Sequence, residues 1–190
     1  MDELKLERIE IGLPGACLIK PAVFCDGRGF FFESYHEANY ADLGIRDHFV
    51  QDNHARSEQI HTLRGLHYQI SRPQAKLCRV VQGKVLDVIV DIRKGSSHFG
   101  RHVPTILSAE NKVQLYVPPG FAHGYLVLEA PVEFLYKCSE FYVPEWDRGI
   151  AWNDPKLGID WGIEDPILSQ RDKCHPGLSD VSPEELPLFE

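Results

Sequence analysis

The stretch Lys84-Val85-Leu86-Asp87-Val88-Ile89-Val90-Asp91-Ile92-Arg93 decides the fold class. Its even-numbered positions from Leu86 to Ile92 are all apolar, whereas Asp87, Asp91 and Arg93 stand at odd-numbered positions. A period of two residues is typical of a β-strand that buries one face and turns the other to solvent. We therefore predict a half-buried strand here.

The neighbouring segments show the same alternation. Residues 112–117 alternate, and residues 132–138 place four side chains on one face, those of Val132, Phe134, Tyr136 and Cys138. Turn signals separate the strands, namely Gly83-Lys84, Lys94-Gly95-Ser96-Ser97 and Pro118-Pro119-Gly120. Short strands at this spacing favour an all-β sandwich or barrel.

Helical patterns are sparse. His36–Leu43 predicts a short helix, and Ser182-Pro183-Glu184-Glu185 predicts a capped helix start near the C-terminus. After Trp146 the chain is rich in Pro, Asp and Gly, and no repeat or linker interrupts it. We expect a single domain over residues 1–190, with a core at about 14–150 and a C-terminal segment, 151–190, that wraps around it.

Composition excludes several classes of protein. The 190 residues are 43% apolar, and the net charge is −8, from 20 basic and 28 acidic residues. Nucleic-acid-binding domains are normally basic, and no apolar run is long enough to span a bilayer. The charged start, Met1–Lys5, lacks the apolar run of a signal peptide. We expect a soluble cytoplasmic protein with neither nucleic acid nor membrane as a partner.

The cysteines indicate neither a set of disulfide bonds nor a metal site. They are five in number, widely spaced and without a C-x-x-C pair, at Cys17, Cys25, Cys78, Cys138 and Cys174. This pattern argues against a disulfide scaffold and against a thiolate zinc site. We interpret them as free thiols.

The densest run of polar groups among apolar ones is residues 51–79. Within Arg64-Gly65-Leu66-His67-Tyr68-Gln69, a regular strand places His67 and Gln69 on one face and Arg64 on the other, unless Gly65 bends the strand. A lone histidine in a strand is more often a structural, hydrogen-bonded residue than a catalyst. His67 alone therefore leaves both interpretations open.

A second cluster is Pro118-Pro119-Gly120-Phe121-Ala122-His123-Gly124. It has the P-x-G-x-x-H form of the second motif of cupin barrels and resembles that superfamily. Where metal-binding cupins carry H-x-H, this chain has His67-Tyr68-Gln69, and no suitably placed Glu follows. Such a ligand set is poor for Zn, Fe or Mn, so we favour a metal-free site and keep a metal-dependent cupin as an alternative.

Three other candidates each have two interpretations. Tyr136 is either a core tyrosine or a phenol that donates a proton into a cavity. Arg28, between two glycines, lies either in a solvent-facing turn or near a bound phosphate. Ser169-Gln170-Arg171-Asp172 is, from composition alone, a solvated turn.

Taken together and in this order, the motifs resemble the dTDP-4-dehydrorhamnose 3,5-epimerase family. The similarity runs from about residue 14 to residue 172. The matching stretches are Phe24–Phe30, Gln51–Asn53, Leu63–Gln69, Gln74–Arg79, Asp87–Arg93, Leu107–Asn111, Pro119–Gly124, Phe134–Lys137, Trp152–Pro155 and Ser169–Asp172. The resemblance implies a cupin-type jelly-roll barrel with a few short peripheral helices, a homodimer, and no metal or organic cofactor.

The resemblance also implies a role for each matching position. His67 corresponds to the general base, Asp172 to its carboxylate partner, Tyr136 to the proton donor on the opposite face of the sugar, and Lys76 to the cation near the keto oxygen. Tyr142 corresponds to the aromatic residue that stacks on thymine. Further substrate contacts are implied for Arg28, Glu33, Gln51, Asn53, Arg64, His123, Asp147 and Arg171. Arg171 stands where many relatives have Lys, and Asp147 where a Glu is often seen.

These residue types suit proton transfer next to a ketone. A keto group at C4 of a sugar acidifies the protons on C3 and C5, because the carbanion that remains is an enolate. Free imidazole has a pKa of about 6.5, so His67 can act as a base near neutral pH. Lys76 would stabilise the enolate oxygen, and Tyr136 would protonate the carbon.

The expected activity is inversion of C3 and C5 of dTDP-4-dehydro-6-deoxy-D-glucose, which yields dTDP-4-dehydro-L-rhamnose for dTDP-L-rhamnose biosynthesis. The alternatives are a single C3 or C5 epimerase of another deoxysugar pathway, a metal-dependent cupin enzyme, and a binding module that has lost catalysis.

Overall fold

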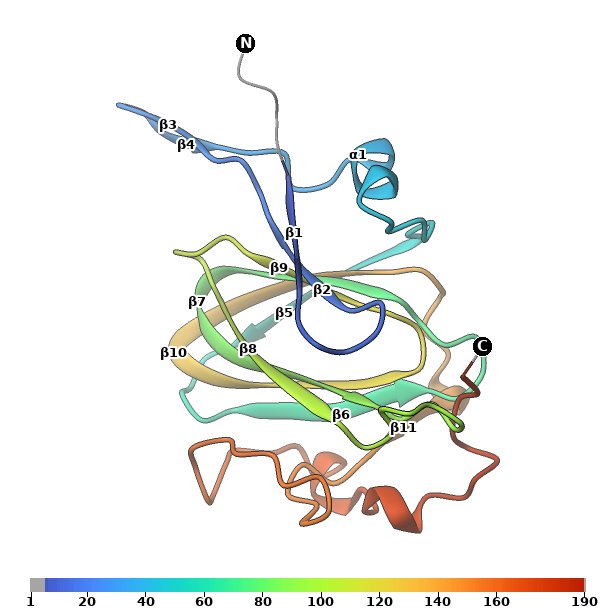
Figure 1. The fold of residues 1–190 in the computed structure, drawn as a ribbon. Coiled ribbons are helices and arrows are strands. Elements are labelled where there is room, and N and C mark those ends of the chain that lie inside the picture. Colours follow the sequence, from blue (N-terminus) through green and yellow to red (C-terminus); the bar gives the residue numbers. More distant parts are fainter. Residues whose placement is uncertain (1–5, 190) are drawn as a thin grey trace.

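The computed structural model describes residues 6–189. Residues 1–5, which carry our signal-peptide argument, lie outside this range. The chain forms strands with few helices, as predicted (Figure 1). In order, the elements are β1 (Glu7–Glu10), β2 (Cys17–Lys20), β3 (Phe24–Asp26), β4 (Gly29–Phe31), α1 (Glu37–Asp42), β5 (Gln51–Ser57), β6 (Leu63–Gln69), β7 (Lys76–Asp91), β8 (His102–Ser108), β9 (Gln114–Val117), β10 (Phe121–Cys138), η1 (Pro144–Trp146), β11 (Asp147–Gly149), η2 (Asp172–Cys174) and η3 (Leu178–Asp180).

Two long strands, β7 and β10, organise the sheet. They pair with each other along their lengths and bend, so that each contributes to two layers (Figure 1). The first part of β10 also pairs with β6, and its last part pairs with β5. Likewise β9 pairs with the start of β7, and β8 pairs with its second half. The predicted cupin-type jelly roll is confirmed.

The bend in β7 lies at Gly83. We predicted a turn between two strands there, and that prediction is wrong, because β7 continues through the position. Gly83 has φ +76°, and a Cβ atom on it would overlap the carbonyl oxygens of Glu129 and Pro131 on β10. The glycine therefore allows β7 and β10 to approach each other closely where they bend, and the pairing of the two strands continues past it.

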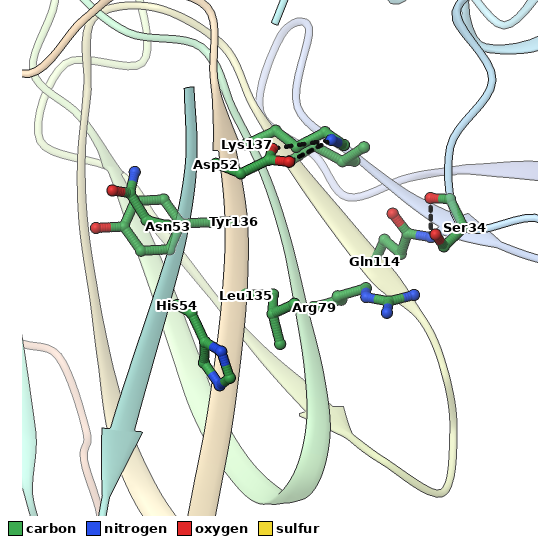
Figure 2. Close-up of a pocket in the computed structure, with 10 residues that line it drawn as sticks. Ser34, Asp52, Asn53, His54, Arg79, Gln114, Leu135, Tyr136 and Lys137 are labelled. Atoms are coloured by element: carbon green, nitrogen blue, oxygen red, sulfur yellow. Dashed lines mark hydrogen bonds and ion pairs between the residues drawn. The ribbon is translucent and has the colours of Figure 1, made fainter. Parts of the chain in front are cut away.

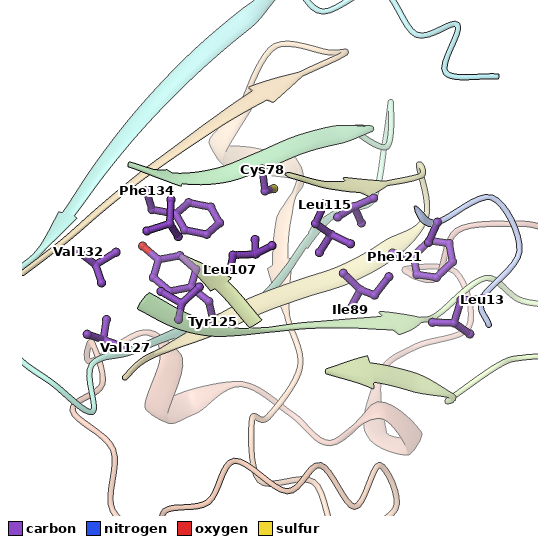
Figure 3. Packing of buried hydrophobic residues seen from close by; sticks show 14 residues of the cluster. Leu13, Cys78, Ile89, Leu107, Leu115, Phe121, Tyr125, Val127, Val132 and Phe134 are labelled. Carbon is purple, nitrogen blue, oxygen red and sulfur yellow. The ribbon is translucent and has the colours of Figure 1, made fainter. Parts of the chain in front are cut away.

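The barrel interior is packed with apolar side chains (Figure 3). Tyr125 stacks on Phe134 with ring centroids 4.2 Å apart. The predicted inward face of residues 132–138 is confirmed, because Val132, Phe134 and Cys138 are buried and Tyr136 packs against the core cluster that contains Val132 and Phe134. Alternation along β10 thus directs Tyr136 to the interior.

A second apolar cluster lies on the outside of β7. Val88, Val90 and Ile92 are buried against the C-terminal segment, including Trp161 and Leu178. The predicted half-buried strand is therefore wrong, since its second face is covered too. On the inward face, Asp87 and Asp91 are fully buried, with His123 and Arg93 respectively as hydrogen-bond partners.

The peripheral elements differ in how well the local pattern predicts them. The predicted helix at residues 36–43 forms as α1, with the His36 side chain accepting from the Asn39 N–H. The predicted helix start at Ser182 is wrong, since that segment is a turn closed by Glu185 N–H donating to the Ser182 carbonyl. No helix in residues 6–189 is long and apolar enough to cross a membrane.

The hairpin of β3 and β4 projects away from the rest of the chain (Figure 1). Its aromatic residues are exposed, Phe30 at 60% and Phe31 at 67%. Two large apolar rings in water are unfavourable for an isolated arm.

Candidate active site

A cavity of about 330 Å³ opens between the two layers of the barrel. Seven of its lining side chains are among those predicted from the sequence, namely Gln51, Asn53, His67, Lys76, Tyr136, Tyr142 and Asp147. Tyr68, Gln69 and Gln74 complete the lining. Five strands, β5, β6, β7, β10 and β11, thus contribute polar groups to one cavity.

His67 is paired with a buried carboxylate. Its Nε2 lies 2.6 Å from Oδ1 of Asp172, whose side chain is 6% exposed, against 33% for His67. With Nε2–H donating to Asp172, Nδ1 is the nitrogen that can accept a proton. Asp172 is held in turn, because its N–H donates to the Ser169 Oγ at 3.0 Å. The predicted solvated turn at residues 169–172 is therefore wrong at its last position.

Asp172 is strongly stabilised as an anion. Burial alone would raise its pKa, but nearby nitrogens of His175 and His67 and the Ser169 hydroxyl outweigh that effect and hold the pKa well below its usual range. Asp172 is therefore ionised at neutral pH and can stabilise a proton on His67.

Tyr136 enters the cavity from the second half of β10, opposite Asn53 and Cys78 in the strand register. Burial raises the pKa of its phenol well above the ordinary value. Figure 2 shows Tyr136 and Asn53 on one side of β10, away from Arg79, Gln114 and Lys137 on the other side. The phenol is thus a protonated group that faces the same cavity as His67.

Lys76 begins β7 and lines the cavity close to Tyr136, since Cys138 is its cross-strand partner. Among residues 6–189, no carboxylate lies within ion-pair distance of Lys76, whereas Lys137 is paired with Asp52 at 2.8 Å. The positive charge of Lys76 is therefore available to a ligand.

A hydrogen-bonded rim holds Tyr142 at the mouth. The Tyr142 N–H donates to Gln51 Oε1 at 2.9 Å, and its hydroxyl donates to Asp147 Oδ2 at 2.9 Å. Arg171 Nη1 donates to the same carboxylate oxygen at 2.5 Å. The ring is 47% exposed, so one of its faces can receive a flat ligand.

Five predicted contacts are not among the side chains that line the cavity, namely Arg171 of the rim and the four that follow. His123 is buried and bonded to Asp87 at 2.9 Å. Arg64 donates to Ser57 and to the Arg56 carbonyl. Glu33 accepts from Asn39 at 2.6 Å, and Arg28, 91% exposed on the projecting hairpin, is paired with Asp26.

The residues suit a hydrogen-bonded cluster better than a metal centre. His67, Asp172 and His175 place donor atoms within 4.8 Å of one another. The 2.6 Å separation of His67 and Asp172 is shorter than the roughly 3.3 Å that two ligands of a tetrahedral zinc ion keep. Gln69, at the position of the second cupin histidine, donates its amide to the Arg72 and Phe141 carbonyls and accepts from Val143 N–H. It therefore positions the loop that leads to the rim.

No site role was assigned from the sequence to four residues that lie here, Tyr68, Gln69, Gln74 and His175. Gln69 shares the face of His67, which was a usable signal, and Gln74 follows in the same polar run. For His175 the sequence offered only a weak signal, which is its spacing of three residues from Asp172.

Comparison with known proteins identifies the family. The sequence profile of the dTDP-4-dehydrorhamnose 3,5-epimerase family matches residues 10–180. A dTDP-4-dehydrorhamnose 3,5-epimerase of Pseudomonas aeruginosa is 49% identical over 178 residues, which cover 93% of this chain and 98% of that protein.

Two solved structures are also similar. A dTDP-6-deoxy-D-glucose-3,5-epimerase of Legionella pneumophila Philadelphia 1, in complex with dTDP-4-keto-L-rhamnose, superposes with a TM-score of 0.94 at 44% identity, covering 98% of this chain and 100% of that one. A 3'-monoepimerase of Streptomyces bikiniensis, in complex with dTDP-quinovose, has a TM-score of 0.88 at 32% identity, covering 95% and 92%. On these matches in sequence and in fold, the chain belongs to the dTDP-4-dehydrorhamnose 3,5-epimerase family.

Proposed function

We propose that the protein inverts C3 and C5 of dTDP-4-dehydro-6-deoxy-D-glucose to give dTDP-4-dehydro-L-rhamnose, a step of dTDP-L-rhamnose biosynthesis, with no metal or organic cofactor. The observation that carries the proposal is the shared cavity of the His67–Asp172 pair, Tyr136 and Lys76. The sugar nucleotide in the similar Legionella structure supports the substrate class.

His67 is the base. Its Nδ1 takes the proton from the carbon next to the C4 ketone, and the electron pair moves into an enolate. The imidazolium that forms is stabilised by the buried carboxylate of Asp172, 2.6 Å from Nε2. Because Asp172 is ionised before the reaction, its negative charge stabilises the imidazolium as soon as His67 takes the proton.

Lys76 supports the enolate. Its ammonium group has no carboxylate partner in the described part of the chain, so the developing charge on the C4 oxygen is its natural partner. A fixed cation stabilises the negative charge on the C4 oxygen in the transition state more than it stabilises the neutral ketone of the ground state. Such a difference is what accelerates a reaction.

Tyr136 is the acid. Its raised pKa keeps the phenol protonated until a strongly basic enolate carbon lies against it. His67 comes from β6 and Tyr136 from the part of β10 that pairs with β5, so the two groups approach a bound sugar from different layers. Loss of a proton on one side and its return on the other inverts the carbon. The same groups must act twice, so the sugar reorients between the two steps.

The nucleotide lies at the rim in this proposal. Tyr142 stacks on thymine, and Arg171 next to Asp147 faces the diphosphate. Gln51 and Asn53 contact the sugar from β5. Substrate contact by His123 and Arg64 stays a prediction.

The projecting hairpin supports a homodimer. We place Arg28 and Glu33 of one protomer at the cavity of its partner, because the exposed rings of Phe30 and Phe31 require a covering surface. Sedimentation equilibrium of Phe31→Ser against the wild type tests this assignment. A dimer that persists unchanged, with KM for the substrate also unchanged, would contradict it. We also place the enzyme in the cytoplasm, since all five cysteines are free, as a reducing compartment requires.

Proton NMR of the purified protein with dTDP-4-dehydro-6-deoxy-D-glucose in deuterated water tests the function. Deuterium entering at both C3 and C5 is the expected result. The similar Streptomyces 3'-monoepimerase favours one competing function, a single epimerase. Exchange at only one carbon would establish that function instead, and exchange at neither would overturn both.

A further inference from the structure

His175 lies beside the proposed catalytic pair, although the mechanism above does not use it. It follows η2, the three-residue turn that carries Asp172. In a 3₁₀ turn, side chains three residues apart project from the same side. The Nε2 atom of His175 is accordingly 3.4 Å from Oδ1 of Asp172, the same oxygen that meets His67.

Gly149 makes room for this second imidazole. It is the cross-strand partner of His67 in the β6–β11 ladder. A Cβ atom on Gly149 would overlap the His175 ring. The ring instead packs edge-on against His67, with centroids 5.7 Å apart and planes at 83°. Strand and turn thus form a slot that admits an aromatic ring next to the base.

The polar edge of His175 is unsatisfied. Its side chain is only 9% exposed, and Nε2 is buried without a hydrogen-bond partner. A buried polar atom without a partner is costly, so its position requires a reason. The atom faces Asp172 at a distance slightly longer than a good hydrogen bond. A small movement of either side chain would close that gap.

We propose that His175 is a positioning residue, whose Nε2–H confines the Asp172 carboxylate so that Oδ1 stays directed at His67. Asp172 then accepts from two imidazoles, one on each side, and cannot rotate away when His67 gains or loses a proton. The low pKa of Asp172 agrees with this, because His175 contributes to it. The kinetic part of the inference rests on the proposed function, and the structural part does not.

The structural part is tested by NMR of protein labelled with ¹⁵N-histidine, without substrate. The hydrogen-bonded Nε2 proton of His67 should resonate far downfield and exchange slowly with water. His175→Phe keeps a ring beside Gly149 but removes the N–H, so this resonance should move upfield or broaden. His175→Gln places an amide N–H near the same point and should keep it. Lys173→Gln, an exposed change on the same turn, is the matched control.

The kinetic part is tested with the same variants. His175→Phe should lower kcat about tenfold, the lower end of losses seen when an outer partner of a functional histidine is removed. KM should not change, because His175 does not line the cavity of His67. His175→Gln should retain most of kcat, and Lys173→Gln all of it.

Gly149→Ala provides a second route, because it displaces the ring from the opposite side while leaving His175 in the chain. It should reproduce the upfield shift, and near-UV circular dichroism confirms that each variant is folded. A wild-type downfield resonance in both His175→Phe and Gly149→Ala would overturn the proposal. If the resonances follow the prediction but wild-type protein turns over no substrate, the proposed function fails and the positioning role stands.

Discussion

The consequence of neutralising Asp172 can be worked out from the geometry. Asp172→Asn keeps the size of the side chain but removes the charge 2.6 Å from His67 Nε2. At an effective dielectric constant of about 20, an ion pair at that distance is worth about 6 kcal/mol. One third of the His67 side chain is exposed, and doubling the dielectric constant for that solvent lowers the value to about 3 kcal/mol.

Because 1.36 kcal/mol corresponds to a factor of ten, kcat should fall by about 10² to 10⁴. KM should change little, since Asp172 is not among the side chains that line the cavity. Initial rates of product formation, followed by NMR, measure both constants. Asp165→Asn makes the same chemical change at an exposed position and is the control. Wild-type kcat in Asp172→Asn would refute the role of the pair.

Three other predictions concern the rim, the thiols and acid stability. Tyr142→Ala should raise KM about tenfold with little change in kcat, because aromatic stacking on a base is worth about 1–3 kcal/mol; initial rates measure this. In a thiol titration at about pH 8, Cys174 should react quickly and Cys17 should not, because Cys174 is exposed and burial raises the pKa of the Cys17 thiol to about 11. The pKa of Asp172 is lower in the folded protein than in the unfolded chain. Asp172 therefore contributes fully to the free energy of unfolding above about pH 4, and this contribution is lost as the pH falls further. Urea unfolding should accordingly show the stability difference between wild type and Asp172→Asn narrowing below that pH.

The alternation of apolar and polar residues predicted correctly which side chains share a face of a strand. It predicted poorly which faces are covered by other parts of the chain. Alternation assigned Val132, Phe134 and Cys138 to a buried face correctly, because side-chain direction in a strand depends only on position. It left Asp87 on a solvent-facing side and could not show that this residue is buried, because its partner His123 comes from far along the chain. Gly83 illustrates a related limit. A glycine can adopt the positive φ that is observed here either in a turn between strands or in a bend within one strand, and the sequence does not distinguish the two.

The candidate site depended on contacts between distant residues. His67 and Asp172 are 105 positions apart, and spacing alone gave no reason to join them. The family resemblance supplied that pairing as an expectation, and the structure shows the two side chains in hydrogen-bond contact. His175 was not foreseen, because its meaning depends on the slot at Gly149, a feature of strand register that composition does not reveal.

The central claim is that His67 and Tyr136 act on opposite faces of one bound sugar. Tyr136→Phe, incubated with dTDP-4-dehydro-6-deoxy-D-glucose in deuterated water, tests it most directly. The account predicts that deuterium still enters at C3 and C5, because His67 remains, while the sugar keeps its starting configuration. The companion variant His67→Ala should show neither exchange nor inversion. Inversion at the wild-type rate in either variant would contradict the account.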